Sequence, residues 1–299
     1  MEMKRFAQTV QAAVKKELGQ GYEIAFHDIS KNNGVTLTGL TITAKGQNIA
    51  PTIYLDGFYD AYEGGVSLTY IVQKILEIYG KDAPPQSIDM EFFKDFEKVK
   101  DRICYRLINR EKNEQLLSRI PHREFLDLEI CFYYAYQGEK LGNGTILIFN
   151  NHLEMWGTTA EELFALAQKN TPVLFPWECK TIEEALREIQ GEADEDMAGQ
   201  AKEEKGFMKI LGNSAHVYGA ACILYPGVLE ELARKEGRSY YILPSSVHEV
   251  ILLEEEAGEN RGLLKEMIKE VNDTQVSLEE ILSYQLYYFD CADNHIRIF

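Results

Sequence analysis

Apolar residues recur at helical spacing near the start of the chain and at strand spacing soon after it. Phe6, Val10 and Val14 are four residues apart, which places them on one face of a helix that we expect to end at the glycines near residue 20. Residues 22–27 and 35–43 follow, and the second of these segments alternates apolar residues with threonine. An Asn-Asn-Gly sequence between the two segments is typical of a tight turn, so the pattern predicts a helix followed by a β-hairpin.

Segments with helical spacing and segments with strand spacing of apolar residues alternate through the rest of the chain. Aromatic and apolar runs predict strands, and a threonine followed three residues later by glutamate predicts the start of a helix. These elements include strands at 99–108, 125–136 and 218–224, and helices that begin at Thr158 with Glu161 and at Thr181 with Glu184. The alternation indicates an α+β fold of two lobes, in which each lobe has a mixed or mainly antiparallel sheet covered by helices.

We predict two domains, an N-terminal lobe at residues 1–120 and a C-terminal lobe at residues 121–299. Residues 191–206 contain six acids and two lysines and almost no large apolar side chains. A segment that has so little to bury is expected to be a mobile acidic loop inside the second lobe. This loop is also the alternative position for the boundary between the domains.

The charge of the chain restricts its partners. Lys and Arg number 31 and Asp and Glu number 48, which gives a net charge of −17 and predicts that nucleic acid and anionic lipid are not partners. The densest group of cations, Arg102, Arg106, Arg110 and Lys112, is interpreted as a solvated face. A protein partner is compatible with the sequence, and so is a homo-oligomer that pairs open sheet edges.

The sequence also indicates where the protein resides. Its first residues lack the apolar stretch of a secretory signal, and its longest apolar runs fall far short of the roughly 20 residues that a membrane-spanning helix needs. The five cysteines are scattered and lie mostly among apolar residues, which is typical of reduced, buried thiols. We therefore expect a cytoplasmic protein.

The sequence contains none of the common catalytic and cofactor motifs. The chain has no dinucleotide fingerprint, Walker loop, nucleophile elbow, zinc-protease helix or pair of cysteines two residues apart. Asp56, Asp60 and Glu63 on one segment, and Asp127 with Glu129 on another, are interpreted as surface acids. Cys222 lies near His216, but its apolar surroundings favour a structural thiol. We predict no metal site, no cofactor and no catalytic residue.

One polar segment is the candidate for a ligand site. Ser245, Ser246, His248 and Glu249 are crowded between two apolar strands, and a histidine close to a serine is the minimum arrangement for activating a nucleophile. The alternative is an ordinary polar turn, in which the hydroxyl groups cap the backbone. The sequence leaves both interpretations open.

Several segments together resemble a family of proteins of unknown function found in clostridial and related gut bacteria. These segments are residues 50–56, 107–113, 120–128, 156–163, 219–221 and 243–249, of which the last is the most specific. The resemblance spans nearly the whole chain, and the second lobe is also similar to another uncharacterised bacterial family. Neither resemblance implies an activity or a site residue.

Two functions from different classes follow from these observations. The first is a noncatalytic cytoplasmic interaction or regulatory protein, because enzyme motifs are missing and 17 tyrosines suit a binding surface. The alternative is a small-ligand binder or hydrolase-like enzyme with its site around Ser245–Glu249. We expect the first of these functions.

Overall fold

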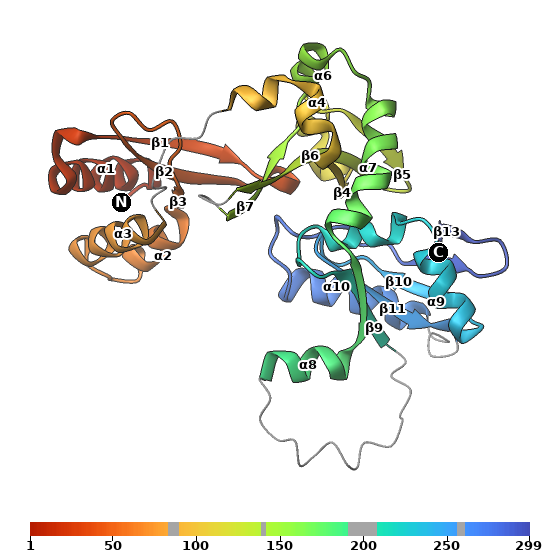
Figure 1. Cartoon of the computed structure of the whole chain (residues 1–299). Coiled ribbons are helices and arrows are strands. Elements are labelled where there is room, and N and C mark those ends of the chain that lie inside the picture. The colour runs from red at the N-terminus through yellow and green to blue at the C-terminus, as the bar shows by residue number, and fades with distance from the viewer. Residues whose placement is uncertain (83–89, 139–141, 191–207, 256–260) are drawn as a thin grey trace. The chain divides into compact units, whose positions relative to one another are not determined.

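The fold begins with a helix, as the apolar spacing predicts, and continues as helices and antiparallel strands. The structure, a computed structural model shown in Figure 1, describes residues 1–82, 90–138, 142–190, 208–255 and 261–299. The acidic segment at 191–206, predicted to be a mobile loop, lies outside the described residues. The α-helices are α1 (Met3–Leu18), α2 (Asp56–Glu63), α3 (Leu68–Asp82), α4 (Phe96–Val99), α5 (Glu114–Leu117), α6 (Asn150–Trp156), α7 (Ala160–Leu174), α8 (Ile182–Gln190), α9 (Val228–Glu236) and α10 (Arg261–Thr274).

The strands and the short 3₁₀ helices complete the element order. The strands are β1 (Tyr22–Ser30), β2 (Thr36–Ala44), β3 (Thr52–Tyr54), β4 (Ile103–Asn109), β5 (His122–Phe125), β6 (Leu128–Gly138), β7 (Gly142–Leu147), β8 (Trp177–Thr181), β9 (Met208–Asn213), β10 (Tyr240–Leu243), β11 (Val250–Glu254), β12 (Tyr287–Asp290) and β13 (His295–Ile298). The 3₁₀ helices include η1 (Gly19–Gly21), η2 (Asn32–Gly34), η3 (Glu91–Lys94), η4 (Lys100–Arg102), η5 (Glu111–Asn113) and η7 (Gly219–Leu224).

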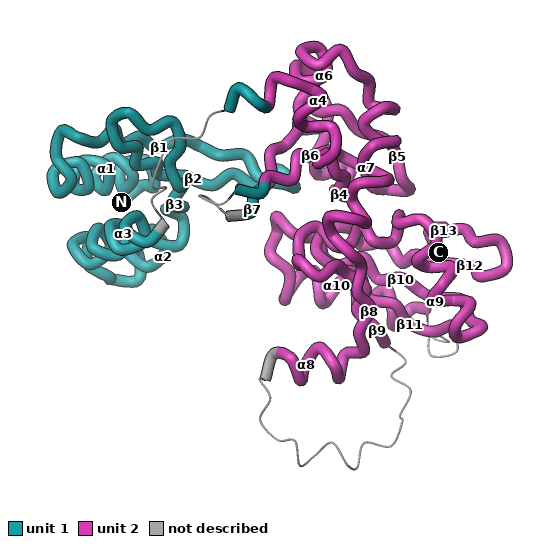
Figure 2. Tube along the Cα trace, in the orientation of Figure 1, with its two compact units in different colours: residues 1–92, 137–144 teal, residues 93–136, 145–299 magenta. Residues whose placement is uncertain are grey.

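Two compact units divide the chain (Figure 2). Unit 1 contains residues 1–92 and 137–144, and unit 2 contains residues 93–136 and 145–299. The predicted lobes were divided near residue 120, whereas β4 and β6 pair across that position, with Ile103 opposite Tyr134. This antiparallel pairing keeps residues 103–134 in one unit, because a break at 120 would separate two hydrogen-bonded strands.

Unit 1 is a three-stranded sheet, ordered β1-β2-β3, packed against helices. Phe6 and Val10 of α1 are fully buried, together with Leu40 of β2 and Ile75 of α3. The helix ends where Gly19 takes a φ of 77°, a conformation that favours glycine. The predicted first helix and hairpin are confirmed, and their apolar faces form the core of this unit.

Unit 2 contains the six-stranded sheet and most of the other sheet, in which the end of β6 and the start of β7 belong to unit 1. β4, β6 and β5 lie side by side with β7 on β6, and the second sheet has the order β13-β12-β10-β11-β9-β8. Every pairing described is antiparallel, which confirms the α+β fold class. α7 packs on β4, and one face of the six-stranded sheet joins the same core through Tyr240, Ile242 and Leu252.

The segment at 218–224 is not the strand that its apolar run predicts. Residues 219–224 form η7, which packs between β4 and β9 with Ala220 and Cys222 fully buried. An unbroken apolar run does not distinguish a buried helical turn from a buried strand, because neither shows alternation. Tyr218 has a φ of 52° at the start of η7, which prevents extended pairing there.

The two predicted capping boxes differ in outcome. The box at Thr181 and Glu184 is confirmed, since Thr181 N donates to Glu184 at 2.8 Å and Glu184 N donates to Thr181 Oγ1 at 3.2 Å. The box predicted at Thr158 is one residue out of place, because the helix α7 is capped by Thr159 and Glu162. No helix among the described residues combines the length and apolar character needed to cross a bilayer.

Candidate functional site

The site is built on one face of the six-stranded sheet in unit 2. Because side chains alternate along a strand, paired residues of neighbouring strands lie in rows on one face. Lys180 of β8 pairs with Ile210 of β9, Ile210 pairs with Ile251 of β11, and Ile251 pairs with Leu243 of β10. This row places one cation at the edge of an apolar floor.

A neighbouring row carries carboxylates around a glycine. Glu178 pairs with Gly212, and a Cβ built on Gly212 would lie 3.5 Å from the Cβ of Glu249. The position between the two acids therefore has no side chain. The floor of the site is apolar along one row and acidic along the next.

A cavity of about 520 Å³ lies over this floor. Its walls include Ala185 and Glu188 of α8, Val271 of α10, and Val276 just after α10. All four residues singled out in the sequence, Ser245, Ser246, His248 and Glu249, also line this cavity. The structure thus brings the predicted site residues together at one opening between the sheet, α8 and α10.

The two serines are held by backbone pairing. Ser245 and Ser246 are each 8% exposed, and Leu282 N donates to Ser245 O at 3.1 Å. Ser246 forms an isolated β-bridge with Ile281, and its hydroxyl oxygen accepts from His248 N at 3.0 Å. Ser246 therefore has the backbone-capping role of a polar turn, while it still lines the cavity.

The His248 imidazole is engaged at both nitrogens. Nδ1 lies 3.1 Å from His216 O and 3.4 Å from Tyr218 N, and Nε2 lies 3.6 Å from a Glu280 carboxylate oxygen. The ring is also stacked on Tyr218, with 5.9 Å between centroids and 8° between planes. Among the contacts of the described residues, neither Ser245 nor Ser246 is hydrogen-bonded to this ring.

Tyr218 is also held by a cation. Arg106 Nη1 donates to the Tyr218 hydroxyl at 2.8 Å, and the guanidinium carbon lies 4.8 Å from the centre of the ring. Tyr133 meets the same ring edge to face at 5.3 Å. Stacking of this kind restricts the tyrosine and through it the histidine at the wall of the cavity.

The loop that presents His216 is stabilised by a buried amide. Asn213, which is 3% exposed, donates through Nδ2 to Val217 O at 2.8 Å and accepts from Val217 N at 3.2 Å. His216 and Tyr218 both have a φ of 52°, an uncommon conformation for residues with side chains. The side chain of Asn213 therefore holds both backbone groups of Val217, the residue between these two.

The other candidate groups have structural partners. Asp56 accepts from Thr38 N at 2.9 Å, and Asp127 accepts from Ser283 and Tyr287 at 2.6 and 2.5 Å. Burial raises the pKa of the Cys222 thiol to about 12, and its sulfur lies 3.0 Å from Gly212 O. Among the described residues, no three His, Cys, Asp or Glu side chains are grouped to hold a metal ion.

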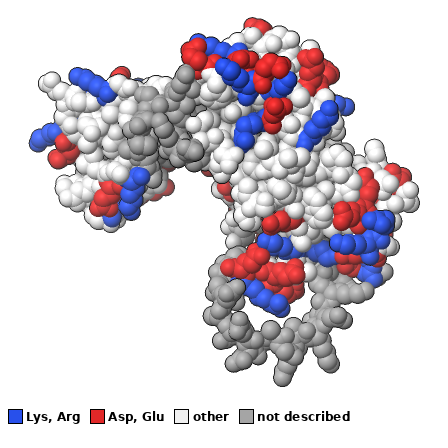
Figure 3. All heavy atoms as spheres, in the orientation of Figure 1, with Lys and Arg blue, Asp and Glu red and all other residues white. Residues whose placement is uncertain are grey.

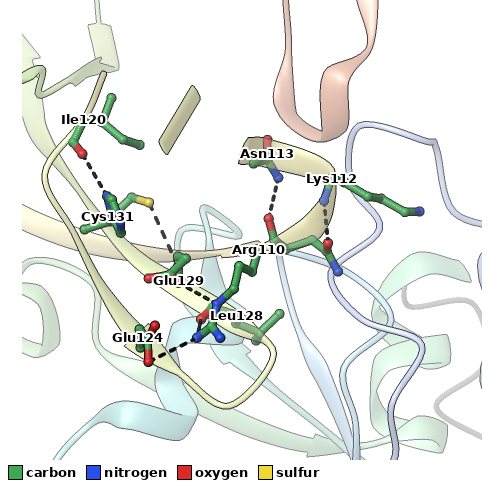
Figure 4. A network of polar contacts seen from close by, with 10 residues as sticks. Arg110, Lys112, Asn113, Ile120, Glu124, Leu128, Glu129 and Cys131 are labelled. Carbon is green, nitrogen blue, oxygen red and sulfur yellow. Dashed lines mark hydrogen bonds and ion pairs between the residues drawn. The ribbon is translucent and has the colours of Figure 1, made fainter. Parts of the chain in front are cut away.

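The cations around β4 do not share one binding surface. Arg110 Nε donates to Glu129 at 2.6 Å, and Glu124 lies 3.9 Å from the same guanidinium (Figure 4). Arg106 is directed to Tyr218 instead, and Arg102 donates to Ala135 O at 2.6 Å. On the face shown in Figure 3, positive and negative side chains are interspersed over both units.

A model of DUF5688, a family of unknown function, matches residues 3–291. The chain belongs to DUF5688. The match covers nearly all of both compact units of this DUF5688 chain and every residue that lines the cavity, which confirms the resemblance to a family of unknown function. No curated protein and no solved structure matches it.

Sequence reasoning missed the half of this DUF5688 cavity that lies before residue 220. Glu178 and Lys180 stand on β8, a five-residue strand whose residues are all half-buried. Gly212 has no side chain to mark it as a lining residue. The usable signal was the capping box at Thr181, which correctly placed α8 next to this strand.

Proposed function

We propose that this chain is a noncatalytic small-ligand-binding protein and that the cavity between the six-stranded sheet, α8 and α10 is its site. The observation that carries the proposal is the convergence of an apolar floor with Ser245, Ser246, His248 and Glu249 at one opening. A volume of about 520 Å³ falls within the range of small-molecule sites, which runs from roughly 300 to 1,000 Å³.

The contacts of His248 support binding over hydrolysis. A serine nucleophile needs an imidazole nitrogen within hydrogen-bonding distance of its hydroxyl group. Here the Ser246 hydroxyl accepts from the backbone of His248, and the ring nitrogens face His216, Tyr218 and Glu280. The polar groups are therefore suited to orient a ligand.

We propose a cytoplasmic location for the same protein. Cys104, Cys131 and Cys222 are buried free thiols, and burial raises the pKa of each to about 12. Unreactive reduced thiols suit a reducing compartment. A protein partner, a homo-oligomer and the exclusion of nucleic acid stay predictions from the sequence.

The test is a ligand screen on the full chain and on two variants at one position. Gly212→Leu fills the space between Glu178 and Glu249, whereas Gly212→Ala adds only a Cβ at an ordinary contact distance. We expect compounds that stabilise the wild type and Gly212→Ala against heat but leave Gly212→Leu unaffected. A ligand at 100 times its Kd adds about 2.7 kcal/mol of stability, which a thermal-shift assay detects.

Native mass spectrometry of protein purified from its own host provides the second measurement. A small mass that is retained in the native spectrum and lost on denaturation supports the proposal. If Gly212→Leu does not fold, Ala185→Phe on α8 replaces it as the blocking variant, because Ala185 is only half-buried. Compounds that stabilise the blocked variant as much as the wild type contradict the proposal, as does a screen without any stabilising compound.

A further inference from the structure

We infer that the ligand of this cavity is a primary amine, protonated at neutral pH and joined to an apolar body. The inference rests on the proposed function and adds the chemical class of the ligand. Three carboxylates line the cavity, Glu178, Glu188 and Glu249, whereas Lys180 is the one Lys or Arg side chain of its described lining. Such a surplus of carboxylates attracts a cation and repels phosphate and carboxylate ligands.

The carboxylates differ in how they are neutralised. Lys180 Nζ lies 2.9 Å from Glu178 and 3.0 Å from Glu188, so this lysine is shared by two acids on one side of the cavity. Glu249 has no cationic partner among the described residues, although it is half-buried. A half-buried carboxylate is stabilised by a cation that donates hydrogen bonds to it.

The Ser245 hydroxyl group is a second polar feature of the cavity wall. Ser245 is 8% exposed and lines the cavity, and its hydroxyl makes no hydrogen bond to any described residue. A hydroxyl group at such a wall has its donor and acceptor capacity available to a ligand. An ammonium group donates three hydrogen bonds, so one ligand nitrogen can serve both this hydroxyl and a carboxylate.

The apolar walls of the cavity indicate the chemistry of the part of the ligand that carries the amine. The floor row of Ile210, Ile251 and Leu243 and the side wall at Val271 offer only hydrocarbon to the cavity. His248 already faces an acid, since its Nε2 lies 3.6 Å from a Glu280 carboxylate oxygen, so an anionic ligand would meet the negative charge of Glu280 at this wall. The geometry therefore favours an alkyl or arylalkyl amine over a sugar phosphate or a fatty acid.

The experiment compares three probes that share one apolar body: 4-phenylbutylamine, 4-phenylbutanol and 4-phenylbutyrate. We measure their Kd values for the full chain by isothermal titration calorimetry at pH 7 in low salt. The amine is expected to bind about tenfold more tightly than the alcohol, as one charge-assisted hydrogen bond allows, and the butyrate most weakly. Glu249→Gln should remove most of the advantage of the amine, because it should raise the Kd of the amine by a much larger factor than the Kd of the alcohol.

A matched control and distinct outcomes separate the two proposals. Glu266→Gln makes the same chemical change at an exposed position of α10 that does not line the cavity, and it should leave all three Kd values unchanged. If the alcohol or the butyrate binds as tightly as the amine, the ligand class is wrong while the binding function stands. If none of the three probes binds, and the broader screen is also negative, both proposals fail.

Discussion

At residue 219 a side chain of any size would collide with the backbone of the candidate site. A Cβ built on Gly219 lies 2.3 Å from His248 O and 2.8 Å from Asn213 N. Both neighbours are backbone atoms, which cannot rotate away. Glycine is thus required at this position, because the backbone at the start of η7 lies very close to the backbone of Asn213 and His248.

We predict that Gly219→Ala destabilises the protein by about 3 kcal/mol, the upper end of the usual cost of overpacking. Urea unfolding measures this free energy. Gly80→Ala is the matched control, because a Cβ there meets nothing within 4 Å and the position is helical. The control should stabilise the protein by about 0.5–1 kcal/mol. Equal effects of the two variants would contradict the assignment of Gly219 to close packing.

The site residues that the sequence singled out share a simple property. Ser245, Ser246, His248 and Glu249 are polar residues crowded between two apolar strands, so composition alone marks them. Glu178 and Lys180 meet them only through the pairing of β8 with β9 and β9 with β11. Strand order in an antiparallel sheet depends on contacts that are distant in sequence, which one sequence does not reveal.

At the scale of elements, capping chemistry and amphipathic spacing were the reliable signals. α1 follows the apolar periodicity of Phe6, Val10 and Val14, and the box at Thr181 correctly marks the start of α8. η7 was misread because all its early residues are apolar and buried, which removes the periodicity. Local chemistry therefore predicts where helices begin, whereas burial on all sides conceals the type of element.

We expect the capping box at Thr181 to stabilise α8 locally. None of residues 182–188 is buried, so α8 depends on its cap and on its contacts with β8 and β9. Thr181→Ala should weaken the helix by about 1 kcal/mol, which is an approximately fivefold faster local opening. Hydrogen exchange of residues 183–188 measures this change, while the midpoint of global unfolding should stay unchanged.

Thr159→Ala is the matched control for Thr181→Ala. It removes the same kind of capping box from α7, whose Leu163, Ala167 and Thr171 are buried in the core of unit 2. The cost of about 1 kcal/mol should then appear in global unfolding, because a helix in the core does not open alone. A global loss from Thr181→Ala as large as that from Thr159→Ala would indicate that α8 belongs to the core.

At the scale of the whole molecule, the boundary between the units depends on strand pairing, which the composition of the sequence does not show. Residues 93–136 belong to unit 2, but the next segment, residues 137–144, belongs to unit 1 again. The chain therefore crosses between the units more than once. A linear division near residue 120 does not describe this arrangement. The two strands that pair across residue 120 are similar in composition, and only their hydrogen bonds show that they belong together.

The net charge of −17 acts on the whole molecule and predicts how its stability depends on salt. Raising the ionic strength from about 0.01 M to about 0.15 M shortens the Debye length from about 30 Å to about 8 Å, which screens the repulsion among surplus acids. The melting temperature should therefore rise. Surface ion pairs such as Lys74 with Glu77 oppose this trend, but exposed pairs contribute about 0–1 kcal/mol each.

Glu266 and Glu270 allow this prediction to be tested by substitution. Both are exposed and stand four residues apart on α10, where like charges repel. Replacing both by Gln should raise the melting temperature at low salt and reduce its response to added salt, as measured by calorimetry. A wild-type melting temperature that falls on adding salt would mean that local ion pairs outweigh the repulsion, and the double variant should then be less stable at low salt.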